Sequence, residues 1–240
     1  MAPGAWFPEV VVGSRVVLRR HDPANLASFR RWYADPEIAR LARYQQGPMR
    51  SEEIERFFAA RVVGPAALAM AIHERAGDRL VGSCAFSQLD GDNGSALFHI
   101  TIGEKDAWGR GYGTEATRLM LDHAFGTLGL HRVALFVFEF NERAIRTYRR
   151  CGFVVEGRSR ESVFRDGRWW DELAMSILQS DWRRAKATDP ASTADPVRGA
   201  EAPDGRDQGN PASPGRGHPE PVARATPTAA RLRRVIRRFT

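Results

Sequence analysis

The chain has 240 residues, a hydrophobic content of 42% and a formal net charge of +7. This length and apolar content suffice for one or two domains with a buried core. Apolar stretches such as 66–72 and 133–138 fall far short of the roughly 20 residues that a membrane-spanning helix requires. The N-terminus lacks a basic head followed by an apolar run, so we expect a cytoplasmic globular protein. Cys84 and Cys151 lack metal-ligand spacing, and we expect buried, reduced thiols rather than a disulfide or a zinc site.

The excess of basic residues lies toward the C-terminal end. Residues 183–240 carry a net charge of +6, and the rest of the chain carries +1. The segment between Trp182 and Phe239 has no aromatic residue and few aliphatic ones, so it cannot bury enough apolar surface to offset its ordering entropy. We therefore predict a folded domain over residues 8–182 and a disordered tail over residues 186–240.

The last residues of the tail have a different pattern. Within 229–240, four apolar residues fall at helical spacing among five arginines: Leu232, Val235, Ile236 and Phe239. This pattern is typical of a short basic amphipathic helix that contacts nucleic acid or an anionic membrane. A solvated extension without a partner is an equally good interpretation.

The first third of the domain predicts one strand and two helices. Residues 13–20 contain a β-branched run typical of a strand. Asp22 and Pro23 supply a cap and a first helical residue for a helix to about Tyr33, and a second helix begins with Ser51 as its cap. That helix presents four apolar residues on one face: Ile54, Phe57, Phe58 and Val62.

Three strands and a series of alternating helices and strands follow. The strands are predicted at 68–74, 80–89 and 95–102, joined by Gly- and Asp-containing turns in an antiparallel meander. A helix over about 113–127 and a strand at 133–138 come next.

Asn141 then caps a helix that Gly152 ends, and two final strands flank the turn at 165–168. The order βααβββαβαββ predicts an α/β (α+β) fold, with a mixed, mostly antiparallel central sheet and helices on both faces.

The most informative motif runs from Trp108 to Glu115 with the sequence WGRGYGTE, between a predicted strand and a predicted helix. Gly109, Gly111 and Gly113 leave room for backbone amides to approach an anion, and the helix N-terminus adds partial positive charge. The Gly-Lys-Ser/Thr of a nucleotide P-loop is absent, and the loop does not follow the first strand of a parallel unit as in a dinucleotide fold. We predict a diphosphate site, and glycines that only make a tight turn are the alternative.

Four segments together resemble the GNAT acetyltransferase superfamily: ITIGEKDAWGRGYGTEA at 100–116, LHRV at 130–133, FEFNERAIRTY at 138–148 and CGF at 151–153. The resemblance covers roughly residues 14–182, and within the superfamily the chain is similar to the RimJ/RimL-like ribosomal-protein N-terminal acetyltransferases. The joint occurrence of these motifs is far more specific than any one of them. The resemblance implies transfer of an acetyl group from acetyl-CoA to an amine, with no metal.

The resemblance also implies where acetyl-CoA binds. Its arm runs along the strand before the glycine loop, and its pyrophosphate rests on the backbone amides of that loop. Trp108 stands where the family commonly has Gln or Arg, a departure that costs little because the amides hold the anion. Asn141 matches a family asparagine that contacts the arm, and its capping role alone is the alternative. The residues implied to bind acetyl-CoA are Ile100, Thr101, Ile102, Gly109, Arg110, Gly111, Tyr112, Gly113, Thr114 and Asn141.

Three residues are candidates for proton transfer. The resemblance implies that Tyr148 protonates the departing thiolate, and a place in an apolar helix stripe is the alternative. Relatives often carry a glutamate on the strand before the glycine loop, but residues 96–99 contain no carboxylate. Side chains alternate along a strand, so Leu97, His99 and Thr101 share one face of the sheet. From that face His99 can reach the site and accept a proton near neutral pH, which makes it a candidate base. A buried, hydrogen-bonded histidine is the alternative. Glu139, acting through water, is the second candidate base.

The acceptor amine stays open at this level. We expect a peptide or protein N-terminal amine slightly ahead of a polyamine or an aminoglycoside, mainly because of the resemblance. A catalytically weak CoA-binding scaffold with a basic, nucleic-acid- or membrane-binding tail is a further alternative. Five aromatic residues could line the acceptor site or belong to the core: Trp32, Tyr33, Tyr44, Trp169 and Trp170.

Overall fold

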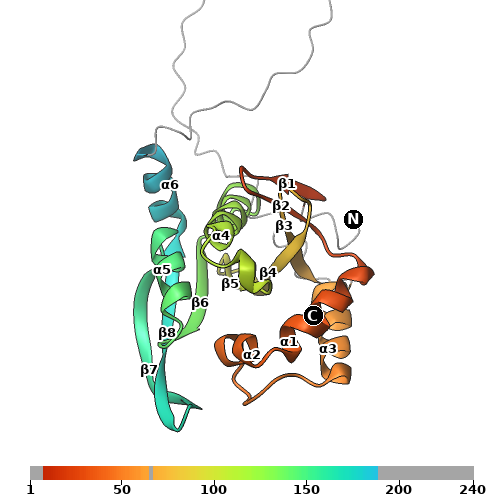
Figure 1. Ribbon diagram of the computed structural model, residues 1–240. Helices are drawn as coiled ribbons and strands as arrows, with labels where there is room; N and C mark the ends of the chain where they lie inside the picture. Colours follow the sequence, from red (N-terminus) through yellow and green to blue (C-terminus); the bar gives the residue numbers. More distant parts are fainter. Residues whose placement is uncertain (1–7, 65–66, 189–240) are drawn as a thin grey trace, which may run out of the picture.

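The computed structural model describes residues 8–64 and 67–188 (Figure 1). The described residues form one eight-stranded sheet in the order β1-β2-β3-β4-β5-β6-β8-β7. Neighbouring strands are antiparallel except for the parallel pair β5 and β6. The strands are β1 (Val10–Val12), β2 (Val16–Arg20), β3 (Leu68–Glu74), β4 (Leu80–Asp90), β5 (Ser95–Ile102), β6 (Arg132–Phe138), β7 (Val154–Arg165) and β8 (Arg168–Leu178).

Helices cover both faces of this sheet, so the predicted mixed fold is confirmed. The α-helices are α1 (Leu26–Ala34), α2 (Pro36–Ala42), α3 (Ser51–Phe57), α4 (Tyr112–Asp122), α5 (Glu142–Arg150) and α6 (Gln179–Thr188). Short 3-10 or π segments adjoin them at η2 (Pro23–Asn25), η3 (Phe58–Val62), η4 (Lys105–Ala107) and η5 (His123–Thr127). In the part of the chain that the structure describes, no helix is both long and apolar enough to cross a membrane.

The predicted first strand and the predicted cap at Ser51 differ from the structure. Gly13 lies in a turn, where its N–H donates to the Val16 carbonyl at 2.8 Å. The expected strand over 13–20 is therefore shortened to β2, and a separate strand that was not predicted, β1, precedes the turn, with Val10 and Val12 exposed. Arg50, rather than Ser51, is the N-cap of α3, and Ser51 is the first helical residue.

Two helices, α2 and α6, were not predicted. The Asp35 side chain accepts hydrogen bonds from the amides of Glu37 and Ile38, and Pro36 opens α2, which repeats the Asp-Pro cap that precedes α1. Helix α6 continues to Thr188, past the expected domain end at 182, and Trp182 anchors it by donating from Nε1 to Asp122 at 2.7 Å. The tail beyond 188, including the basic segment 229–240, lies outside the described residues.

The two faces of the sheet bury separate cores. The larger, which we call the α4 core, packs α4 and α5 against strand residues such as Leu18, Phe98 and Met175. The smaller, the α1 core, lies under α1 to α3 and includes Phe29 and Trp32. Cys84, Cys151 and Tyr148 belong to the α4 core. Because strand side chains alternate between faces, successive residues of β5 point in turn toward the α4 side and the α1 side of the sheet.

The sheet divides between β5 and β6. These strands pair only over three residues, from Ser95 opposite Arg132 to Leu97 opposite Ala134. Beyond that point β5 still pairs with β4, as far as Ile102, and β6 still pairs with β8. Figure 1 shows the two halves of the sheet diverging toward the end that carries α1 and α2. The divergence leaves the second half of β5 without a strand partner on its β6 side among the described residues.

Candidate active site

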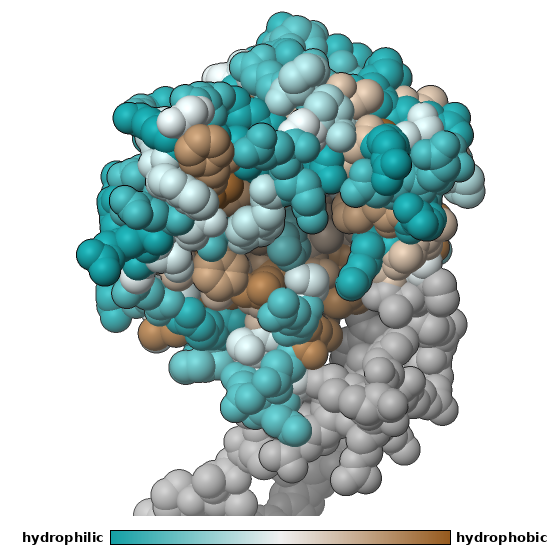
Figure 2. All heavy atoms as spheres, turned by 90° about the horizontal axis from the view of Figure 1, so that it is seen from below, coloured by the Kyte–Doolittle hydropathy of each residue, from teal (hydrophilic) through white to brown (hydrophobic). Residues whose placement is uncertain are grey.

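A cavity of about 1530 Å³ occupies the divergence between β5 and β6. Both faces of β5 contribute to its wall, because Phe98 and Ile100 line it together with His99 and Thr101. The cavity therefore passes from the α4 side of the sheet to the α1 side. Figure 2 shows apolar side chains gathered around a hollow on the face seen from below.

The glycine loop closes one end of the cavity. Gly109 and Gly111 have φ of 77° and 84°, the left-handed region that glycine adopts without steric cost. Gly111 is the N-cap of α4, so the first amides of this helix have no partner within the helix and point outward with its partial positive charge. Gly109, Gly111 and Gly113 all line the cavity. These features fit a diphosphate, as the sequence predicted.

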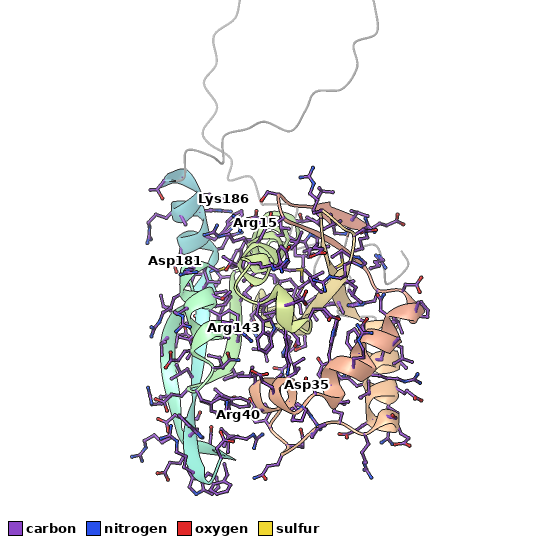
Figure 3. The ribbon with its side chains drawn as sticks, viewed as in Figure 1. Arg15, Asp35, Arg40, Arg143, Asp181 and Lys186 are labelled. Carbon is purple, nitrogen blue, oxygen red and sulfur yellow. The ribbon has the colours of Figure 1, made fainter. Side chains whose placement is uncertain are left out.

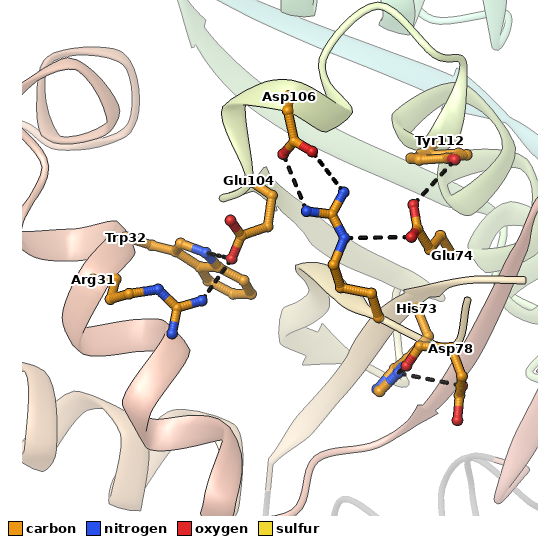
Figure 4. A network of polar contacts seen from close by, with 9 residues as sticks. Arg31, Trp32, His73, Glu74, Asp78, Glu104, Asp106 and Tyr112 are labelled. Carbon is orange, nitrogen blue, oxygen red and sulfur yellow. Dashed lines mark hydrogen bonds and ion pairs between the residues drawn. The ribbon is translucent and has the colours of Figure 1, made fainter. Parts of the chain in front are cut away.

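A network of ion pairs holds the loop against the β3–β4 hairpin (Figure 4). The Arg79 guanidinium donates to both carboxylate oxygens of Asp106, at 2.8 and 3.2 Å, and to Glu74 at 3.3 Å. Tyr112, at the start of α4, donates from its hydroxyl to Glu74 at 3.3 Å. The Arg79 and Asp106 side chains are largely exposed, so their pair contributes little stability. It joins the segment before the loop to the β3–β4 hairpin.

Trp108 ties the other end of the loop to β5. Its indole Nε1 donates to the Ile102 carbonyl at 2.7 Å, and the Arg143 guanidinium of α5 lies 3.5 Å from its ring centroid (Figure 3). Glu104, just before the loop, accepts from Arg31 at 2.7 Å and from Trp32 Nε1 at 2.8 Å. The tryptophan that departs from the family pattern thus connects β5, the loop and α5.

The predicted acetyl-CoA residues lie together around the cavity, with one exception. Its wall includes all of them except Arg110. Arg110 lines a separate hollow of about 540 Å³ with Ser14, Arg15, Arg75, Ala76 and Tyr112. Asn141 lines the cavity and also caps α5, because its Oδ1 accepts from the Ala144 amide at 3.2 Å. Its two predicted roles are therefore compatible in the structure.

Tyr148 reaches the cavity from the α4 side. It is 7% exposed, belongs to the α4 core and lies with its ring centroid 5.8 Å from that of Phe153. Burial raises the pKa of Tyr148 above its ordinary value, so the phenol stays protonated at neutral pH. The structure thus places a protonated phenol at the cavity wall.

His99 reaches the cavity from the opposite side of the sheet. His99 is exposed rather than buried, and its Nε2 lies 2.6 Å from the Ser87 hydroxyl oxygen. Desolvation by the surrounding protein lowers the pKa of His99 below its ordinary value. The imidazole is therefore neutral at neutral pH and can accept a proton. Tyr148 and His99 thus face the same cavity from opposite sides.

Glu139, the second candidate base, is not brought to the cavity. Its carboxylate accepts from the Arg158 guanidinium at 2.7 Å, and among the described residues Glu139 does not contribute to the cavity wall. Arg158 also pairs with Asp171, at 2.6 Å. The chain turns just after β6, and this turn directs Glu139 toward the β7–β8 hairpin.

The sequence did not single out Glu172 of β8, which lines the cavity and is 9% exposed. Its carboxylate accepts a hydrogen bond from the Tyr44 hydroxyl. Glu172 is opposite Phe138 in the β6–β8 register, and no local sequence signal marks a strand residue that becomes buried in this way. Glu53 also lines the cavity, but it is paired with Arg43 at 3.1 Å.

The five candidate aromatic residues have different locations. Tyr33 and Tyr44 line the cavity, whereas Trp32 is 2% exposed in the α1 core. Trp169 is exposed near the β7–β8 turn, and Trp170 packs its ring against Phe140. Of the five, only Tyr33 and Tyr44 can therefore contact an acceptor in the cavity that the described residues form.

Comparisons with known proteins agree with this geometry. Residues 15–154 match the acetyltransferase (GNAT) domain family. A spermidine N(1)-acetyltransferase of Vibrio cholerae is 35% identical over 109 residues, which are 45% of this chain and 62% of that protein. The putative ribosomal N-acetyltransferase YdaF of Bacillus subtilis is 32% identical over 107 residues, 45% of this chain and 58% of that protein. The matched segments thus span about three fifths of these curated relatives.

A solved structure extends the comparison to the whole fold. Spermidine N-acetyltransferase from Vibrio cholerae, crystallised in complex with CoA and spermine, superposes with a TM-score of 0.63 and 25% identity. The superposition covers 71% of this chain and 99% of that one. The family match includes β2 to β6, the glycine loop and Tyr148. The chain therefore belongs to the GNAT acetyltransferase family.

Proposed function

We propose that this protein transfers the acetyl group of acetyl-CoA to a primary amine. The observation that carries this proposal is the divergence of β5 and β6. It creates a cavity with the glycine loop at one end, and Tyr148 and His99 on opposite sides. The family membership and the relatives that are named as amine acetyltransferases support the same reaction.

Acetyl-CoA as substrate fits the residues that line the cavity. The amides of Gly111 to Thr114 at the start of α4 would hold the pyrophosphate. The unpaired edge of β5 from His99 to Ile102 offers backbone N–H and C=O groups, as an edge strand does to an added strand, and the amide-containing arm can pair with it. Arg143 adds positive charge beside the loop.

The reaction forms a bond between the acceptor nitrogen and the acetyl carbonyl carbon and breaks the bond from that carbon to sulfur. An acceptor that arrives as an ammonium ion first loses one proton to solvent, because only the neutral amine can attack. The attacking nitrogen then loses a second proton as the amide forms, and the sulfur leaves as a thiolate that takes up one. We assign proton donation to Tyr148, which is protonated at the cavity wall, and proton acceptance to His99, which is neutral there. Both residues line the same cavity, and the assignment places Tyr148 beside the leaving sulfur and His99 beside the attacking nitrogen.

Two acceptor classes are supported by different observations. Relatives named as spermidine acetyltransferases favour a polyamine. The cavity wall favours an acceptor with one ammonium group, such as the peptide N-terminus of a RimJ/RimL-like substrate. Within the described residues this wall contains two carboxylates, and one of them, Glu53, is already paired with Arg43. A polyamine would bring several positive charges to a single remaining carboxylate.

Thiol release from acetyl-CoA tests the proposal. The full chain is incubated with acetyl-CoA and each of four acceptors: spermidine, 2-phenylethylamine, kanamycin and a peptide with a free N-terminus. We expect thiol release that depends on at least one amine and saturates with it. Release that is the same with and without every amine would contradict acetyl transfer. A preference for the peptide or the monoamine over spermidine would support the single-ammonium acceptor.

A further inference from the structure

Glu172 lies on the α1 side of the cavity. It is directly opposite Phe138 in the antiparallel β6–β8 pair, so the two side chains share a face. Alternation along β6 places Ala134 on that face as well, and Ala134 is opposite Leu97 of β5. Leu97 and His99 alternate together on β5. Glu172 and the candidate base His99 therefore face the cavity from the same side of the sheet, opposite to Tyr148.

The Glu172 carboxylate is buried without a cation. It is 9% exposed, and among the residues that the structure describes no Lys, Arg or His forms an ion pair with it; its hydrogen-bond donor is the Tyr44 hydroxyl. Surrounding protein and the Glu172 charge raise the pKa of Tyr44, so the phenol keeps the proton that it donates. A buried carboxylate is costly unless a positive charge accompanies it. A cationic ligand in the cavity would supply that charge.

The loop that carries Tyr44 is held in place from the β7–β8 hairpin. Arg165, 7% exposed, donates from Nη2 to the carbonyls of Arg43, Tyr44 and Gln45 at 2.6, 2.7 and 3.0 Å. The Tyr44 ring also packs edge-on against Phe138, with centroids 5.2 Å apart. Contacts with β6, β7 and β8, which are all distant from Tyr44 in sequence, therefore hold its hydroxyl beside Glu172.

We propose that Glu172 binds the ammonium group of the acceptor amine, with Tyr44 as a positioning residue that orients the carboxylate. This inference rests on the proposed acetyl transfer and names the residue that recognises its second substrate. The ammonium would lie on the same side of the sheet as His99. An adjacent carboxylate favours the charged form of an amine, so Glu172 strengthens binding of the acceptor and does not itself accelerate bond formation.

The substitution Glu172→Gln tests the assignment, because it removes the charge and keeps the size. Steady-state kinetics are measured with spermidine, 2-phenylethylamine and a peptide with a free N-terminus. For each amine that the wild type acetylates, we expect the KM for the amine to rise about tenfold or more, since a charge-assisted hydrogen bond is lost. The KM for acetyl-CoA should stay within about twofold. Glu55→Gln, a charge removed from outside the cavity wall, should change neither value.

A second readout separates recognition from a structural role. Removing the carboxylate lowers the pKa of the bound amine, so the acid limb of the kcat profile should move to lower pH in Glu172→Gln. Tyr44→Phe, at a partly exposed site, should raise the KM for the amine by a smaller factor and leave the folded protein intact.

Each result bears on one of the two proposals. Unchanged KM for the amine in both Glu172→Gln and Tyr44→Phe, with a working wild type, would overturn the assignment of Glu172 and leave acetyl transfer standing. A wild type that acetylates none of the three amines would instead contradict the proposed function.

Discussion

Tyr148 is held at the cavity wall by the α4 core, where burial raises its pKa. Tyr148→Phe removes the hydroxyl and leaves the packing with Phe153. If the phenol protonates the leaving sulfur, kcat at saturating acetyl-CoA should fall by roughly a hundredfold or more, as for the loss of a general acid, and the KM for acetyl-CoA should change little. Thiol release measures both values. An unchanged kcat would remove Tyr148 from the chemistry and leave it a core residue.

The burial of His21 leads us to expect that the stability of the protein depends on pH. Its ring nitrogens lie 3.1 Å from Asn25 Oδ1 and 2.9 Å from Ser83 Oγ, and burial, with a smaller contribution from nearby His73, lowers the pKa of His21 to about 4. The unfolded chain, with an ordinary pKa near 6.5, binds the proton first as pH falls. Stability should therefore be lost between about pH 6.5 and pH 4, by on the order of 3 kcal/mol.

Urea unfolding at about pH 7 and about pH 4.5 measures this loss, and His21→Gln supplies the comparison. Glutamine can hydrogen-bond to Asn25 or Ser83 but does not titrate. The loss of stability on acidification should therefore be smaller in His21→Gln than in the wild type. Equal losses in the two proteins would show that other groups cause the pH dependence.

Among the secondary-structure elements, the divergence of β5 from β6 matters most for the proposed function, because it opens the cavity. Alternate amides of β5 point away from β4, and past Leu97 those amides have no strand partner in the described part of the sheet. Acetyl-CoA should therefore slow hydrogen exchange in a peptide covering 97–103. A peptide covering 16–20, in a strand paired on both sides, should show no change. Equal exchange at 97–103 with and without acetyl-CoA would argue against binding along β5.

Most elements could be predicted from the sequence, because their signals are local. The Asp22–Pro23 cap, the Asn141 cap and the Asp166–Gly167 turn each depend on a few adjacent residues, and the structure confirms them. Helix α2 has the same Asp-Pro cap and was missed because it follows α1 after a single residue, Asp35. Strand β1 is short and largely exposed, so it lacks the buried alternation that identifies a strand.

The candidate site could be predicted only in part, and the division follows distance along the chain. The glycine loop and Tyr148 belong to motifs whose residue types and spacing are visible locally. Glu172 and Tyr44 are 128 positions apart, and they meet only through the β6–β8 register and the Arg165 contacts. Glu139 is the opposite case, a residue that the sequence suggested and the structure leaves outside the cavity wall. The turn after β6 places its carboxylate against the Arg158 guanidinium. Neither outcome is encoded in a short segment.

At the scale of the whole molecule, the sheet separates the two halves of the proposed reaction. The glycine loop and Tyr148 come from the α4 side, whereas His99, Glu172 and the Tyr44 loop come from the α1 side. The cavity joins the two sides at the only parallel pair in the described sheet. This arrangement lets a donor and an acceptor approach the same point from opposite faces.

The most direct test of this account is mass spectrometry of the amine after incubation of the full chain with isotope-labelled acetyl-CoA. Thiol release alone also follows from hydrolysis, whereas a label on nitrogen requires transfer. We predict that at least one of spermidine, 2-phenylethylamine, kanamycin and a free-N-terminus peptide gains one labelled acetyl group on an amine, and that Tyr148→Phe forms this product much more slowly. Labelled acetate as the sole product, with every amine unmodified, would contradict the account.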